Sequence, residues 1–317
     1  MKQLVTAERF CLIGHLGAMA FGLAGLLLVM PHPEFLSLLP AGQTLFQWSM
    51  AGGGVVYILL GTIAVAVYAY RTLGLRNWLV FMLPAILISL SSELLGTSTG
   101  FPFSDYSYLS GLGYKIAGLV PFTIPLSWFY LGLASYLLAR AGLGIGQVNA
   151  AGELPKFGWL RQIVAIALGA LLLTSWDFVL DPAMSQTAMP FWYWHQPGAF
   201  FGMPYQNFAG WMGTGAVFMT VAALFWRTRQ PVLQRSQLNL PIVIYLGNFV
   251  FATVMSLAAG IWIPVVLGVV LGVVPAVICW RTSQTADLEA ISVTGFVSET
   301  ESLKPKQPPA AVGVSAK

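Results

Sequence analysis

The sequence predicts an all-α fold: a polytopic helical membrane protein with about eight transmembrane helices and both termini in the cytoplasm. Three observations support this class. Of the 317 residues, 57% are hydrophobic and 8% are charged, whereas about a quarter of the residues in a soluble domain are charged. The apolar residues form long runs, which favour helices over the short alternating strands of a β-barrel. The basic residues recur in alternate connections between these runs.

Each apolar run is close to the ~20 residues that a helix needs to cross a bilayer. We expect spans at Arg9–Met30, Phe46–Tyr70, Trp78–Leu95, Ala117–Ala139, Trp159–Leu180, Phe208–Trp226, Pro241–Ala259 and Ile261–Trp280. The last two are so close that they form either a tight hairpin or one broken element. The first run is long and ends in Pro-His-Pro, so we interpret it as a retained span rather than a cleaved signal. Residues 1–282 then form a multi-pass transmembrane domain, and residues 283–317 a disordered polar tail.

The basic residues predict the orientation of the spans. They precede the first span, fill every second connection and follow the last span, at Lys2, Arg9, Arg71, Arg76, Arg140, Lys156, Arg161, Arg227, Arg229, Arg235 and Arg281. The other connections contain Lys115 as their one firm cation. The positive-inside rule therefore places both termini in the cytoplasm. The same scatter, with a net charge of +4, is not typical of a nucleic-acid-binding protein, and no nucleic-acid partner is expected.

Several polar residues then fall at or beyond the non-cytoplasmic ends of the helices: Glu93, Asp105, Asp177, Asp181, His195 and Asn207. We expect them to share one membrane face, although they are far apart in sequence. A charged side chain at the centre of a membrane helix costs ~2.5–3.5 kcal/mol on insertion scales. Carboxylates in such helices therefore indicate a functional site near the segment Leu171–Trp211, which contains most of these residues.

Asp177 and Asp181 are four residues apart and so share one helix face. Pro182 disfavours helical geometry at the preceding residue, so the helix is expected to end at Asp181. Two close carboxylates in a low-dielectric site cannot both ionise cheaply, so one is expected to stay protonated and act as a general acid. The alternative is structural: Asp181 caps a turn, and Asp177 bonds Trp176 or the backbone.

Glu93 lies in the last turns of a predicted span. It is either a second acid and water acceptor, or it bonds Ser91, Thr97 or Thr99 in its own segment.

Asp105 and Asn207 occupy matching places in two segments of the form G-x-P-[FY]-x-[DN]-[FY], at residues 100–106 and 202–208. Each either caps the following helix or orients water. The two segments are either a duplicated helix-pair feature or two similar Gly-Pro turns.

Aromatic residues crowd the same region. For Trp192 and Trp194 we expect an ordinary aromatic belt at the membrane interface. For Trp176 the belt and the stabilisation of a cationic intermediate by the ring face are equally good interpretations.

We expect Cys11 and Cys279 to be reduced, buried thiols. Among the histidines, neither His15 nor His195 has partners at ligand spacing, and no nucleotide-binding motif is present, so no metal and no cofactor are expected.

Three segments carry a resemblance to a known family: Ser92–Tyr108 (SELLGTSTGFPFSDYSY), Trp176–Pro182 (WDFVLDP) and Phe200–Trp211 (FFGMPYQNFAGW). The chain resembles the CruF-type carotenoid hydratases from about the second span to the last. The resemblance implies a non-redox addition of water to the terminal C1′=C2′ double bond of an acyclic ψ end group, as in γ-carotene or lycopene, without metal or nicotinamide. It also implies a carotenoid substrate in the bilayer of a cell membrane or thylakoid-type membrane. Relatives that act in myxol glycoside synthesis pass their product to a carotenoid glycosyltransferase, which is a candidate partner.

The residues fit this chemistry, because protonation of an alkene needs a poised acid and leaves a cation. We expect Asp177 to donate the proton and Asp181 to tune it, with Glu93 as the alternative acid. Glu93, Asp105 and Asn207 would position water and take up its proton. The candidate substrate-binding residues are Phe103, Tyr106, Tyr108, Trp176, Tyr205 and Trp211.

Two other functions stay open. Asp177 and Asp181 form a D-x-x-x-D that resembles half of the metal-diphosphate motif of membrane prenyltransferases. A second aspartate-rich motif and basic residues on the same face are missing, which argues against that enzyme. A secondary transporter would place its polar groups near the bilayer midplane, whereas here they gather at one end.

Overall fold

The computed structural model describes residues 1–38, 40–146, 158–186, 190–228 and 230–283. The polar tail expected from residue 283 onward lies outside the described residues, apart from Ser283. The α-helices are α1 (Lys2–Ala24), α2 (Gly42–Thr99), α3 (Thr123–Gly142), α4 (Gly158–Met184), α5 (Tyr205–Trp226), α6 (Asn239–Ala258), α7 (Ile263–Gly268) and α8 (Val274–Thr282). Short 3-10 or π-helical pieces accompany them: η1 (Gly25–Val29), η2 (Pro33–Leu38), η3 (Arg235–Leu238) and η4 (Val269–Val273).

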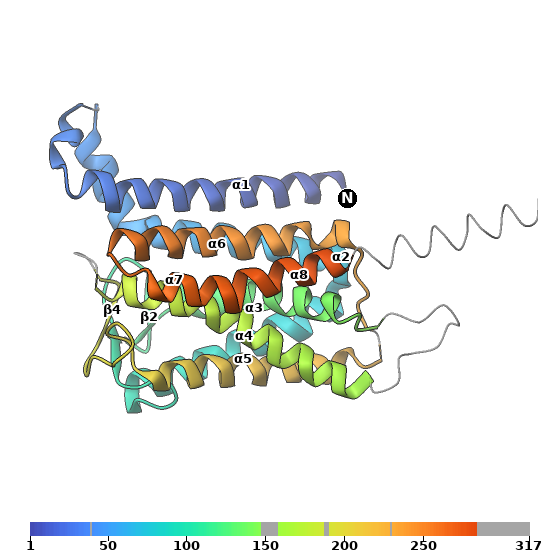
Figure 1. Cartoon of the computed structure of the whole chain (residues 1–317). Coiled ribbons are helices and arrows are strands. Elements are labelled where there is room, and N and C mark those ends of the chain that lie inside the picture. Colours follow the sequence, from blue (N-terminus) through green and yellow to red (C-terminus); the bar gives the residue numbers. More distant parts are fainter. Residues whose placement is uncertain (39, 147–157, 187–189, 229, 284–317) are drawn as a thin grey trace, which may run out of the picture.

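The helices lie alongside one another in a bundle, with α1 at its edge (Figure 1). Four strands of two or three residues supplement them, as two antiparallel pairs: β1 (Tyr106–Tyr108) with β4 (Trp192–Trp194), and β2 (Lys115–Ile116) with β3 (Val120–Pro121). The labelled strands lie at one end of the bundle, and the N-terminus lies at the other. The predicted all-α membrane fold is therefore correct, with a small amount of sheet at one end.

Six helical ranges among the described residues are long and apolar enough to cross a membrane. They are Lys2–Val29, Gly52–Thr99, Gly158–Met184, Tyr205–Trp226, Arg235–Ala258 and Ile263–Thr282. The expected count of about eight is not established by this measure. A count of eight spans requires that α3, which is not among the six, also crosses the membrane, and that α2 crosses it twice. The cytoplasmic placement of the termini stays a prediction.

α2 is too long to be one straight span. From Tyr57 to Glu93 a straight helix would extend ~54 Å, yet both side chains line the same cavity. The reversal lies at Gly74, whose φ of 81° and ψ of 160° are non-helical and are readily adopted only by glycine. The two halves of α2 correspond to the spans expected at Phe46–Tyr70 and Trp78–Leu95.

Two helix boundaries differ from the sequence prediction. α4 continues past Pro182 to Met184, so the prediction that it ends at Asp181 is wrong. Proline loses only its own N–H, and the Ser185 amide still donates to the Asp181 carbonyl at 3.0 Å. The fourth span was expected from Ala117, but α3 begins at Thr123, because β2 and β3 form a small hairpin in the preceding residues.

α3 is the central helix of the bundle: its residues from Ser127 to Arg140 are buried without interruption. α6 and the α7–η4–α8 segment form the hairpin that was one of the two expected arrangements. The turn between them contains Gly260 in the left-handed region, with φ 74°, and the two segments lie side by side in Figure 1.

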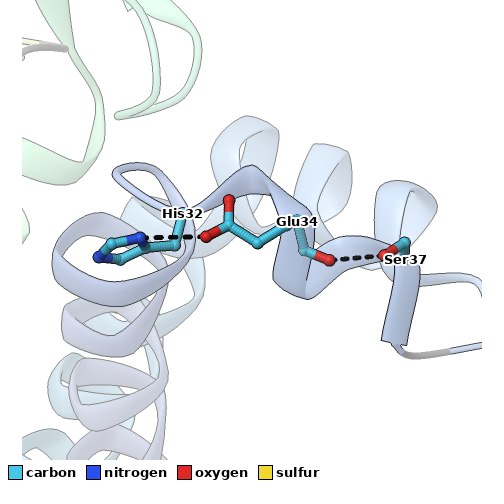
Figure 2. Close-up of polar contacts among 3 residues, drawn as sticks. All are labelled: His32, Glu34 and Ser37. Atoms are coloured by element: carbon cyan, nitrogen blue, oxygen red, sulfur yellow. Dashed lines mark hydrogen bonds and ion pairs between the residues drawn. The ribbon is translucent and has the colours of Figure 1, made fainter.

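The connection between α1 and α2 is exposed and holds itself together through local bonds. His32 Nδ1 lies 3.2 Å from Glu34 Oε1, and the Ser37 hydroxyl donates to the Glu34 carbonyl at 2.6 Å (Figure 2). Both ionisable side chains of this contact are more than half exposed. This histidine therefore caps a surface turn and does not belong to the buried site described below.

Close glycine contacts join the C-terminal segment to α4. A Cβ atom on Gly268 would lie 2.3 Å from Val179 Cγ2 and 3.1 Å from the Ser175 carbonyl oxygen. One turn later, a Cβ on Gly272 would lie 2.4 Å from Ser175 Oγ. Small residues at this spacing allow two membrane helices to approach closely, where van der Waals packing holds them together.

We predict that Gly268→Leu lowers the free energy of unfolding by about 1–3 kcal/mol or more, because the added side chain must force α7 away from α4. Gly213→Leu is the matched control, since a Cβ there meets no atom within 4 Å. Thermal unfolding in detergent measures both variants. Equal stability of the two would contradict the assigned helix contact.

Candidate active site

A cavity lies between the end of the helix bundle and the β1–β4 pair. It holds about 680 Å³ of space outside atoms, its mouth included. All but two of the predicted site residues line it: Glu93, Phe103, Tyr106, Tyr108, Trp176, Asp177, Asp181, Asn207 and Trp211. Of the six polar residues expected on one membrane face, Glu93, Asp177, Asp181 and Asn207 line this one cavity, although they are far apart in sequence.

Glu93 is buried in the second half of α2, with 3% of its surface exposed. Its Oε2 accepts hydrogen bonds from the hydroxyls of Tyr106 and Tyr108, the latter at 2.9 Å. Its Oε1 accepts one from the indole N–H of Trp128 at 2.9 Å. The local alternative, a side-chain bond to Ser91, Thr97 or Thr99, is not what the structure contains. Glu93 instead joins α2 to α3 and to strand β1.

Asp177 and Asp181 share one face near the end of α4, as their spacing predicts. The side-chain amide of Asn207, in the first turn of α5, donates to both: 2.8 Å to Asp177 Oδ2 and 3.0 Å to Asp181 Oδ2. The same nitrogen lies 3.0 Å from Met203 Sδ. All three polar residues are at least 97% buried. One amide group therefore bridges two carboxyl groups inside the protein.

The β1–β4 pair forms a lid over the cavity. Its inner face donates hydrogen bonds to Glu93 and to Asp181. Side chains alternate along a strand, so residues two apart point to the same side. Tyr106 stands opposite Trp194, and Tyr108 stands opposite Trp192. The tyrosines donate to Glu93, while the indole N–H groups of Trp192 and Trp194 donate to Asp181 Oδ1 at 2.9 and 3.1 Å.

Burial raises the pKa of the Tyr106 and Tyr108 hydroxyls well above the ordinary tyrosine value, and the neighbouring Glu93 carboxylate adds to the effect. Both phenols therefore stay protonated at neutral pH. They are fixed as hydrogen-bond donors to Glu93.

Indole rings line the same cavity as Glu93, Asp177 and Asp181. The rings of Trp128 and Trp211 are stacked with centroids 3.9 Å apart, and Trp176 meets Trp211 edge-on at 5.9 Å. The Trp176 N–H donates to the Asn248 carbonyl at 3.1 Å, which fixes the ring. The faces of such rings attract a cation, by ~2 kcal/mol or more in a dry site.

Two predicted residues lie elsewhere. The side chain of Asp105 is 61% exposed and 3.9 Å from His195, and Tyr205 is 63% exposed; neither lines the cavity. The sequence similarity of the two Gly-Pro segments is misleading here. Asn207 enters the first turn of α5 and points inward, whereas Asp105 precedes a strand on the outside of the lid.

Sequence reasoning missed Trp128 and misread Trp192 and Trp194, whose N–H groups serve buried carboxyl groups rather than a membrane interface. The W-Y-W pattern could have revealed the last two, because residues two apart in a strand share a face. No comparable signal identified Trp128, since its bond to Glu93 joins residues 35 positions apart.

Among the described residues, no group of three or more histidine, cysteine, aspartate or glutamate side chains is arranged to hold a metal ion. His15 is fully buried in α1, where Nδ1 lies 2.7 Å from the Tyr57 carbonyl and Nε2 lies 3.0 Å from the Asn248 amide. A carbonyl can only accept, so Nδ1 carries the proton and Nε2 accepts from the amide. This histidine is a satisfied structural residue.

Comparisons with known proteins identify the family of the chain. The family model described as "Carotenoid biosynthesis protein" matches residues 53–275, which is more than half of the chain. A curated relative, the bisanhydrobacterioruberin hydratase of Haloarcula japonica, is 37% identical over 131 residues. The match covers 41% of this chain and 40% of the relative, so it spans less than half of that protein. No solved structure matches the chain.

We predict that Glu93→Leu lowers stability far more than Glu93→Gln. Leucine leaves three buried donors without an acceptor, at a cost of about 1–3 kcal/mol each, whereas glutamine retains one acceptor oxygen. Unfolding of the purified variants in detergent measures the difference. Similar melting temperatures for the two would show that Glu93 does not hold the lid.

Proposed function

Because this chain belongs to the carotenoid biosynthesis protein family, we propose that it is a carotenoid hydratase. It adds water to the C1′=C2′ double bond of an acyclic ψ end group, as in γ-carotene or lycopene, and produces a tertiary alcohol at C1′. The reaction is non-redox: one C–H and one C–O bond form as the π bond and an O–H bond of water break. The observation that carries the proposal is the pair Asp177 and Asp181, bridged by Asn207 in a cavity lined by aromatic rings.

Hydrogen-bond donors distinguish the three acidic groups. Glu93 accepts three N–H or O–H bonds from other side chains, and Asp181 accepts three. Asp177 accepts the Asn207 bond as its one such bond among the described residues. Donors stabilise the ionised form of a carboxyl group, so the proton is held most cheaply by Asp177. Asp177 is therefore the general acid, and Asp181 and Glu93 are the carboxylates.

Proton transfer from Asp177 to C2′ leaves a tertiary cation at C1′. The ring faces of Trp176 and Trp211 and the negative charges of Asp181 and Glu93 stabilise this cation. Hydrogen bonds fix Trp176, Asp181 and Glu93 before the reaction, and stacking on Trp128 fixes Trp211. Little reorganisation is therefore needed when the charge forms. Water then attacks C1′ from the polar side of the cavity.

The attacking water must lose a proton after the C–O bond forms. Asp181 and Glu93 are the carboxylates able to accept it, and return of the proton to the ionised Asp177 completes the cycle. Asn207 positions the two aspartates through its two hydrogen bonds. Its amide nitrogen donates but does not take up a proton, so it does not carry a proton from one aspartate to the other. This division replaces the broader assignment that included Asp105.

The substrate is a hydrocarbon dissolved in the bilayer, and the product carries a hydroxyl group. The proposal includes a downstream carotenoid glycosyltransferase that acts on this hydroxyl, and it places the protein in a cell membrane or thylakoid-type membrane.

The described lining of the cavity contains no lysine or arginine to hold a diphosphate, which disfavours the prenyltransferase alternative. Transporters bind their substrates near the bilayer midplane, so the position of this site at one end of the bundle disfavours a transporter.

We predict that Asp177→Asn lowers hydration by about 10²-fold or more, the usual contribution of a general acid, while the protein stays folded in the membrane. Asp105→Asn should retain near-normal activity, because its side chain is outside the cavity. Carotenoid products are measured by chromatography in a host that accumulates lycopene or γ-carotene. Near-normal product from Asp177→Asn would remove that residue from the role of acid.

We predict that the product is heavier by one water and that its oxygen comes from labelled water. Mass spectrometry after expression in H₂¹⁸O-enriched medium, with a parallel culture under labelled dioxygen, checks the source. Oxygen from dioxygen would make the enzyme an oxygenase and would end the acid-catalysis mechanism. Conversion that requires added magnesium and a diphosphate would favour the prenyltransferase.

A further inference from the structure

A second cavity adjoins the acidic one. The two share Tyr57, Leu112 and Met184 as a common wall. The second cavity extends between α1, the first half of α2 and α6, with about 560 Å³ of space outside atoms when the open solvent at its mouth is included. Its described lining has no charged side chain. It is an apolar compartment that leads from the acidic site toward the lipid-facing edge of the bundle, where α1 is largely exposed.

Glycines make this compartment hollow. A Cβ on Gly22 of α1 would meet no atom within 4 Å, and a Cβ on Gly53 of α2 would meet the Ser49 hydroxyl at 3.6 Å as its nearest contact. The same two helices touch closely further along, where a Cβ on Gly61 would lie 2.8 Å from the His15 ring. α1 and α2 are thus packed tightly over one part of their length and stand apart over the other. Gly22 and Gly53 leave space at the cavity, whereas Gly54, which also lines it, permits the close approach of the Gly111 carbonyl.

We propose that this second cavity holds the hydrocarbon chain of the carotenoid whose end group lies in the acidic cavity, with entry from the lipid between α1 and α2. This inference rests on the proposed function. Along α1 and η1 the lining extends from Ala18 to Leu26, a length of ~12 Å in a helix, which suits an extended, narrow chain. A flat polyene fits beside glycines, where a bulkier lining would exclude it.

The common wall determines which end groups reach the acid. Tyr57 is held by stacking on Phe251, with ring centroids 5.9 Å apart, while Met184 is a flexible side chain that can repack. An acyclic end group is thin enough to pass beside Met184 and present its double bond to Asp177. A long apolar chain bound in this way engages one end of the carotenoid at a time.

The test fills the compartment without touching the acidic site. Gly22→Leu and Gly53→Leu place a side chain in the open space, and Gly17→Leu is the control, because that glycine is on the exposed face of α1 and also has no neighbour within 4 Å. Each protein is expressed in cells that accumulate lycopene and purified in detergent. Two quantities are measured: lycopene retained per mole of protein, and hydration of lycopene compared with hydration of a short acyclic terpene that has the same terminal double bond.

We expect both cavity variants to lose lycopene binding and lycopene hydration on the order of tenfold or more, while hydration of the short terpene and the Gly17→Leu control stay at the wild-type level. Unchanged lycopene binding in the cavity variants would overturn the inference. So would an equal loss of both substrates, which indicates structural damage. If the wild type binds lycopene, the cavity variants do not, and no protein hydrates either substrate, the chain-binding site stands and the hydratase proposal fails. A wild type that binds no lycopene overturns the chain-binding site, and a wild type that also hydrates neither substrate overturns the hydratase proposal as well.

Discussion

The burial of three acidic side chains at one end of an apolar bundle is the constraint on which this structure depends. An ionised carboxyl group in such a place is tolerated only if hydrogen-bond donors surround it. Glu93 obtains its donors from α3 and the strand β1, and Asp181 obtains its donors from β4 and α5. The lid is therefore attached to the helices through the same groups that perform the proposed chemistry.

This arrangement explains why a membrane protein contains a small sheet at this point. Strand pairing places two phenols and two indoles on one face, at the close spacing of neighbouring strands. A helix would separate side chains of this kind around its circumference. The β1–β4 ladder thus supplies two hydrogen-bond donors to Glu93 and two to Asp181.

The helices around the cavity show two opposite uses of glycine. At Gly268 the missing side chain lets α7 approach α4 closely, while at Gly22 and Gly53 it leaves an open compartment next to the acidic site. Hydrogen bonds around Asn248 add rigidity at the centre of the bundle. Its side chain accepts from Tyr130 and donates to His15, and its backbone carbonyl accepts from the Trp176 ring. The wall of the site is therefore fixed from the centre of the bundle, and its lipid-facing side stays open.

The sequence by itself determined the class of the protein, the approximate positions of its helices, and the principal acids. Hydropathy is a local property, and the cost of burying Glu93, Asp177 and Asp181 can be read without knowing their partners. The tertiary structure alone decided the rest: that Trp128, Trp192 and Trp194 serve these acids, that Asn207 bridges two of them, and that Asp105 lies outside. These outcomes depend on contacts between residues far apart in the chain and on the direction of each side chain. Two Gly-Pro segments of similar pattern can therefore place one polar residue in the site and the other in solvent.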